Sequence, residues 1–177
     1  MATARKGSSG NQTALLACVL FACLLGLCGK VAALAPDWSH WYDTVFQHVD
    51  TEHGMPNASV TALAQDGEGF IWVGTQDGLA RWDGYRFHNY QPRSQDRNSL
   101  PGNLVFALHT DSKGRVWVGT ASSGLARYER SIDGFVRING ISQASVFAIE
   151  DDGAGGIWAG TWGGGLNHVD PEGRIQV

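Results

Sequence analysis

The stretch DGEGFIWVGT at residues 66–75 occurs twice more in this chain, as DSKGRVWVGT at 111–120 and as DGAGGIWAGT at 152–161. The tryptophans of the three copies are 45 and 41 residues apart. A period of about 40–50 residues indicates one supersecondary unit repeated in tandem. Because a single unit of this size cannot bury its own apolar face, the copies must pack against one another.

Each copy lies inside a set of four short predicted strands. In the first set, 60–64 alternates in polarity and 70–73 is apolar on both faces, as a strand between two layers should be. Aspartate–glycine turns lead into strands over 79–82 and 85–90, since Asp bonds its own backbone and Gly adopts positive φ. The other strands are expected over 105–108, 115–119, 125–128 and 134–138, and over 146–149, 157–160, 166–169 and 173–177. This order favours an all-β fold of four-stranded antiparallel β-propeller blades, the last one incomplete.

The repeated tryptophans lie in mid-strand between aliphatic neighbours, so we expect them to be wedges between blades rather than a platform for a ligand. The glycine two residues after each tryptophan should allow another backbone or side chain to approach the strand end closely. These structural positions of the repeat are Trp72, Gly74, Trp117, Gly119, Trp158 and Gly160.

The repeats resemble the two-component regulator propeller repeat, in which a short strand is followed by D-x-x-G, two residues and W-[IV]-G-T. The stretch 98–105 is similar to the linker that joins such blades, and 46–60 is similar to the segment that leads into the first blade. The resemblance places blades at about 60–90, 105–138 and 145–177. It implies a seven-bladed ring in the exported sensor region of a receptor of the hybrid histidine kinase or diguanylate cyclase type.

The number of predicted blades indicates whether the sequence contains a whole propeller or only part of one. Three blades leave two open sheet faces and unpaired strand edges, which invite association. Residues 45–49, within a lead-in segment over 36–59, read as an outer strand of a blade that would close the ring. We therefore expect 60–177 to be a partial propeller and the chain to be an N-terminal fragment of a longer receptor. A short protein that completes its ring by self-association is the alternative.

The segment 1–35 reads as a signal peptide. Arg5 and Lys6 precede an apolar run over 14–28, and the small residues Ala33 and Ala35 follow it. The run is short for a membrane span of about 20 residues, and an uncleaved N-terminal membrane anchor is the alternative. Both interpretations predict an exported, periplasmic protein.

Composition excludes several functions for residues 36–177. The three cysteines all lie in the leader, so the exported part has no disulfide. Removing Arg5, Lys6 and Lys30 from the 13 basic residues leaves 10 against 17 acidic residues, a net charge of −7. This charge argues against nucleic acid as a partner, and we expect membrane contact only through the leader or a C-terminal span outside this sequence.

The titratable residues show no catalytic or metal-binding pattern. The acids Asp66, Glu68, Asp111, Asp151 and Asp152 lie in turns and lack the alternating spacing of a calcium loop. The six histidines show no paired motif, so no metal and no cofactor are expected.

The candidate ligand-binding residues follow the repeated Gly-Thr. Loops between the second and third strands should share one face of the propeller with the segments between blades, where ligands usually bind. The candidates on this face are Gln76, Asp77, Ser122, Ser123 and Trp162. Trp162 is followed by three glycines and could stack on a sugar ring, or it could pack on the next blade.

The resemblance implies an extracytoplasmic ligand-sensing propeller without a catalytic module of its own. Any kinase or cyclase activity would reside in a C-terminal module absent from this sequence. A carbohydrate or another small extracytoplasmic molecule is the expected ligand, and further blades or a second copy are the expected protein partners. The alternatives are a protein-interaction scaffold and a fragment of a secreted propeller enzyme such as a lyase.

Overall fold

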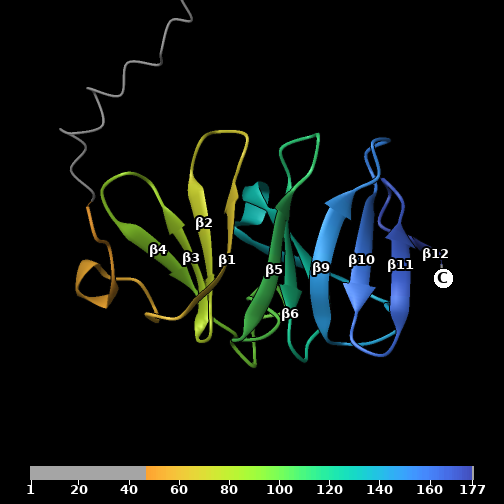
Figure 1. Ribbon diagram of the computed structural model, residues 1–177, viewed down its shortest axis with the longest axis horizontal. Helices are drawn as coiled ribbons and strands as arrows, with labels where there is room; N and C mark the ends of the chain where they lie inside the picture. The colour runs from red at the N-terminus through yellow and green to blue at the C-terminus, as the bar shows by residue number, and fades with distance from the viewer. Residues whose placement is uncertain (1–46, 177) are drawn as a thin grey trace, which may run out of the picture. The chain divides into compact units, whose positions relative to one another are not determined.

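The computed structural model describes residues 47–176, which form three four-stranded antiparallel sheets (Figure 1). Blade 1 consists of β1 (Val60–Gln65), β2 (Ile71–Thr75), β3 (Gly78–Trp82) and β4 (Phe87–Tyr90). Blade 2 consists of β5 (Val105–Thr110), β6 (Val116–Thr120), β7 (Leu125–Glu129) and β8 (Gly134–Ile138). Blade 3 consists of β9 (Val146–Asp151), β10 (Ile157–Thr161), β11 (Gly165–Val169) and β12 (Ile175–Gln176). The predicted all-β fold of three four-stranded blades is confirmed.

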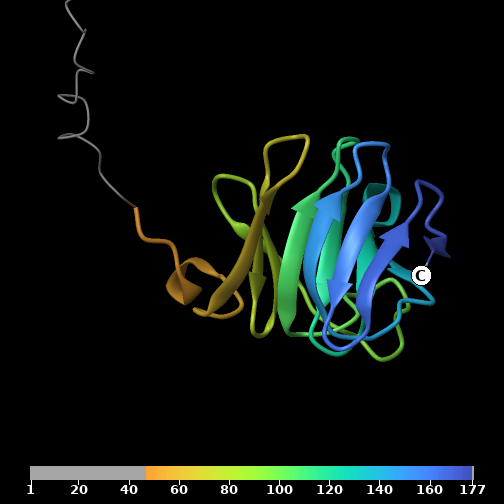
Figure 2. The same ribbon diagram turned by 45° about the vertical axis from the view of Figure 1, so that its right-hand side comes forward.

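The blades follow one another in chain order, with their first strands side by side (Figure 2). β1 contacts β5, and β5 contacts β9. Each first strand carries an irregularity near its start, where one extra residue interrupts the pairing with the second strand. Such a bulge turns a side chain out of the regular alternation of the sheet.

The core lies between the blades, because each sheet is apolar on the face that meets its neighbour. Trp72 of blade 1 packs into a cluster that includes Val116, Val118 and Phe135 of blade 2. Trp117 of blade 2 packs in the same way against Ile149 and other residues of blade 3. Both indole side chains are fully buried.

The glycines after these tryptophans lie in close contact with the next blade. A Cβ atom added at Gly74 would lie 2.8 Å from a methyl group of Val105, and one added at Gly119 would lie 2.8 Å from a methyl group of Val146. At Gly160 the nearest atom would be the Cβ of Ala148 in the same blade, at 3.5 Å.

Two predicted segments differ from the structure. The strand expected over 85–90 begins only at Phe87, because the Asp83 carboxylate accepts hydrogen bonds from the backbone N–H groups of Tyr85 and Arg86 and holds them in a turn. The strand expected over 45–49 is not formed at 47–49, where the backbone is irregular, and 45–46 lie outside the described residues.

Two 3₁₀-helices complete the described part of the chain. They are η2 (Thr51–His53) and η3 (Arg130–Ile132), and neither was predicted. Among residues 47–176 no helix is long and apolar enough to cross a membrane. The leader over 1–35 lies outside this range.

Candidate functional site

The loops after β2, β6 and β10 lie at the same end of the sheets as the segments that lead into β1, β5 and β9. One backbone hydrogen bond recurs there: Gln76 N–H donates to Ser59, Ala121 N–H to Leu104, and Trp162 N–H to Ser145, with N···O distances of 3.3, 2.9 and 2.9 Å. We call the surface formed by these loops and segments the loop face.

The five candidate ligand-binding residues all lie on the loop face. Gln76 and Ser122 are exposed, whereas Asp77 and Ser123 are half-buried. The Ser123 side chain packs against the segment before β5, where it would meet a Cβ added at Gly102 at 2.8 Å. Trp162 is 75% exposed.

Trp162 does not stand alone on the loop face. Its ring lies 5.6 Å from that of Phe147, and Phe147 stacks on Phe106 at 4.4 Å with an interplanar angle of 25°. We call Phe106, Phe147 and Trp162 the aromatic platform. Phe147 is 46% exposed and Phe106 is half-buried.

The aromatic platform depends on the bulges of the first strands. Phe106 and Phe147 are the extra residues in β5 and β9, and the bulges turn both rings out of the sheets. Blade 1 has Thr61 at this position. Neither phenylalanine was predicted as a site residue, although each follows the first valine of its repeat.

The opposite ends of the sheets carry the Asp-x-x-Gly turns, in which the acids form structure. The Trp72 and Trp117 indoles donate to Asp66 and Asp111, with N···O distances of 2.8 Å in both cases. The other carboxylate oxygen of Asp111 accepts from the Lys113 and Arg115 backbone N–H groups, at 3.0 and 2.9 Å. Burial alone would raise the pKa of Asp111, but the hydrogen bonds from Trp117 and Arg115 outweigh it and lower that pKa.

Blade 3 makes a different contact at this position. Asp152 pairs with His168, at 2.8 Å between the imidazole Nε2 and the carboxylate, and this hydrogen bond lowers the pKa of Asp152. The Trp158 ring lies tilted against the His168 ring, with 4.5 Å between centroids and 36° between planes, and remains 40% exposed.

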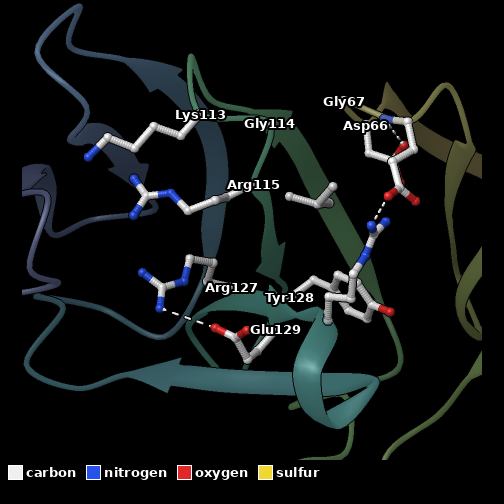
Figure 3. A pocket seen from close by; sticks show the side chains of 11 residues that line it. Asp66, Gly67, Lys113, Gly114, Arg115, Arg127, Tyr128 and Glu129 are labelled. Atoms are coloured by element: carbon white, nitrogen blue, oxygen red, sulfur yellow. Dashed lines mark hydrogen bonds and ion pairs between the residues drawn. The ribbon is translucent and has the colours of Figure 1, made fainter.

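A pocket of about 470 Å³ lies between blades 1 and 2 at the turn end (Figure 3). Its cationic side chains do not converge on a ligand position, since Lys113, Arg115 and Arg127 extend to the side away from Asp66, and Arg130 forms an ion pair with Glu68. Arg115 binds Asp111 and the Gly155 carbonyl, at 2.6 and 2.8 Å. Arg115 thus links its own turn in blade 2 to the turn before β10 in blade 3.

Polar contacts around Asp133 link blades 1 and 2 at their outer strands, and we call this cluster of contacts the Asp133 joint. The Asp133 carboxylate accepts hydrogen bonds from the Tyr90 and Tyr128 hydroxyls, at 2.8 and 2.6 Å. It also lies 3.4 Å from His88 and 3.8 Å from Arg81. Burial raises the pKa of Asp133, but the hydrogen bonds from the Tyr128 and Tyr90 hydroxyls and the Arg81 charge lower it overall. The joint is structural, and it was not predicted.

The fold and its repeated inter-blade packing define a run of β-propeller blades. Residues 54–77 and 99–122 match the two-component regulator propeller model. The chain therefore carries two-component regulator propeller repeats, which confirms the predicted resemblance.

The chain is similar to a histidine kinase and to the extracellular domain of a hybrid two-component system. Over 56 residues the chain is 38% identical to Histidine kinase P4 of Formosa agariphila, which is 32% of this chain and 4% of that protein. The structure matches the extracellular domain of the hybrid two-component system BT3049 from B. thetaiotaomicron with a TM-score of 0.68 and 27% identity. That match covers 74% of this chain and 20% of the BT3049 domain, so the chain spans about a fifth of its length.

A propeller enzyme also shares the fold. Virginiamycin B lyase from Staphylococcus aureus matches with a TM-score of 0.52 over 67% of this chain and 40% of the enzyme. At 15% identity the likeness concerns the fold alone.

Proposed function

We propose that this chain is the ligand-sensing propeller portion of an extracytoplasmic receptor of the two-component type. Two observations support the proposal: the family repeats, and the structural match to an extracellular domain of a hybrid two-component system. In this proposal the chain binds a ligand without transforming it. Kinase or cyclase activity would belong to an output module outside this sequence.

The aromatic platform is the observation that carries the ligand-binding part of the proposal. Apolar rings that are exposed together on one surface mark a site for a ligand or a partner. Trp162 is largely exposed and Phe147 is about half-exposed, and the two rings lie in contact on the loop face. Exposed Ser122 and Gln76 lie on the same face and supply a hydroxyl and an amide for hydrogen bonding.

A carbohydrate has the chemistry that suits this surface. One face of a sugar ring is apolar and can lie flat on an aromatic ring, while its hydroxyl groups bond to polar side chains around it. Binding would favour one arrangement of the propeller over another and so shift the equilibrium of the receptor.

A glycan array tests the proposed ligand class. The 177-residue chain, expressed for export, is applied to an array of plant and microbial oligosaccharides. We expect binding to a small related set of glycans, lost in Phe147→Ala and kept in Tyr85→Ser, a 92%-exposed aromatic control away from the platform. Absence of binding to every glycan would rule out the carbohydrate class, and unchanged binding by Phe147→Ala would rule out the site.

A further inference from the structure

A polar pocket of about 980 Å³ lies between the segment that joins blades 1 and 2 and the outer strand β8 of blade 2. Three exposed arginines line it: Arg93 and Arg97 come from the joining segment, and Arg137 comes from β8. We call it the arginine pocket. Because its walls all belong to the described residues, its shape does not depend on further blades.

The three arginines have no carboxylate partner in the described part of the chain. Residues 47–176 contain nine arginines, and six of them form ion pairs: Arg81, Arg86, Arg115, Arg127, Arg130 and Arg174. The three that form none within these residues all line the arginine pocket. Carboxylates are not scarce, since residues 36–177 carry 17 acidic side chains against 10 basic ones. The gathering of three unpaired arginines therefore indicates a site for an anionic partner.

The charge of the arginine pocket is positive. Asp96 is the one acidic residue among its described lining residues, and its carboxylate accepts a hydrogen bond from the Asn98 backbone N–H at 2.9 Å. Three cations thus stand against one carboxylate that already supports a turn. A guanidinium group presents a planar fork of donors that binds a carboxylate through two parallel hydrogen bonds. A partner with several carboxylates fits this surface.

The edge of β8 beside the arginine pocket is open to an extended chain. β8 pairs only with β7 in its sheet, and its Phe135 N–H points to the other side, where it donates to the Asn98 carbonyl at 2.7 Å. Backbone groups of alternate residues in an antiparallel strand point to the same side. Those of Arg137 therefore point outward as well, and no backbone group within residues 47–176 bonds to them there. An extended peptide can add to such an edge.

The arginine pocket suits a peptide better than a sugar. Phe135 is the only aromatic among its described lining residues and is 1% exposed, so no ring is available to stack on a sugar. The free backbone groups at Arg137 instead match the repeating donors and acceptors of a peptide backbone.

We propose that the arginine pocket binds an extended acidic peptide. The peptide backbone continues the sheet at the free edge of β8, and its carboxylates bind Arg93, Arg97 and Arg137. Acidic residues two apart in an extended peptide point to the same face and can reach the arginines together. The arginine side chains repel a basic strand and so select an acidic one. This site is separate from the aromatic platform and goes beyond the proposed function.

Fluorescence polarisation with the 177-residue chain, expressed for export, tests this proposal. The probe is a short labelled peptide of alternating threonine and glutamate, and the same peptide with glutamine in place of glutamate is the uncharged control. We expect the glutamate peptide to bind at least about tenfold more tightly, because it forms charged hydrogen bonds. Arg97→Gln and Arg137→Gln should each weaken its binding about tenfold. Arg86→Gln is the matched control, an exposed arginine outside the pocket, and should bind as the wild type does.

Further measurements separate this site from folding defects and from the proposed sugar site. Thermal melting should be unchanged in the arginine variants, because all three side chains are exposed. Trp162→Ala should keep full peptide binding, so the two sites fail independently. Absence of binding, equal binding of the two peptides, or full binding by both pocket variants would overturn the proposal. Tighter binding of an oligogalacturonate of equal charge would also overturn it and assign the pocket to acidic sugars.

Discussion

The repeated tryptophan has two environments in this protein. Trp72 and Trp117 are completely buried, and each indole N–H donates to the aspartate six residues earlier. Trp158 is 40% exposed, and the corresponding aspartate binds His168 instead. Burial of the ring and hydrogen bonding of its N–H therefore coincide where a neighbouring blade covers it.

This difference predicts unequal costs of truncation. Trp117→Ala should lower the free energy of unfolding by about 3–5 kcal/mol, because it opens a cavity in the core between blades 2 and 3. Trp158→Ala should cost about 1 kcal/mol or less, as substitutions at exposed positions usually do. Urea unfolding at low protein concentration measures both, and equal losses would contradict the assignment of Trp117 as a wedge.

Asp111 should make stability depend on acid pH. Its folded-state pKa is lowered, so the stability that its charged form contributes is present above the unfolded pKa of about 3.9 and is lost as the pH falls through the folded value. Asp111→Asn should cost about 1.5–3 kcal/mol at pH 7, since hydrogen bonds to a charged acceptor are lost.

The pH dependence of unfolding distinguishes this account from a simple packing defect. Denaturant unfolding of wild type and Asp111→Asn between pH 7 and pH 3 should show the two curves converging toward low pH. Parallel curves over the whole range would show that the Asp111 charge contributes nothing to stability.

At the scale of the strands, the second strand of each blade has a glycine just before its final threonine, and the contacts of this glycine depend on the next blade. Gly119→Ala should be strongly destabilising, because the added Cβ would lie 2.8 Å from a Val146 methyl group and 3.0 Å from the Val146 carbonyl oxygen. Gly160→Ala adds the same methyl group with its nearest contact at 3.5 Å and should be tolerated. Thermal melting of the two variants compares them directly, and similar melting temperatures would refute the close-packing role of Gly119.

Strand order could be predicted from sequence because turn chemistry and polarity alternation are local signals. The strands start and end within about two residues of the predictions, and Asp83 explains the late start of β4 at Phe87. The aromatic platform could not be predicted, because it combines bulged residues of β5 and β9 with the loop after β10. The Asp133 joint likewise depends on Tyr90, which comes from another blade.

At the scale of the whole molecule, packing and recognition are carried by different tryptophans. The mid-strand Trp72 and Trp117 fill the spaces between sheets, whereas Trp162 lies on the loop face with Phe147. The sheets thus form a scaffold, and the loops that follow the repeated Gly-Thr can vary without disturbing it. Loops on a rigid scaffold commonly carry binding residues, and this arrangement underlies the proposed sensor function.

The separation between packing tryptophans and a ligand-binding tryptophan is tested most directly by isothermal titration calorimetry. The ligand is the oligosaccharide that binds most strongly on the array. We predict that Trp162→Ala weakens affinity at least about tenfold, or about 1.4 kcal/mol, without lowering the melting temperature. Trp158→Ala, a change of the same size on a sheet face, should leave the affinity within about twofold, or about 0.4 kcal/mol. Loss of binding in Trp158→Ala together with full binding in Trp162→Ala would contradict the account.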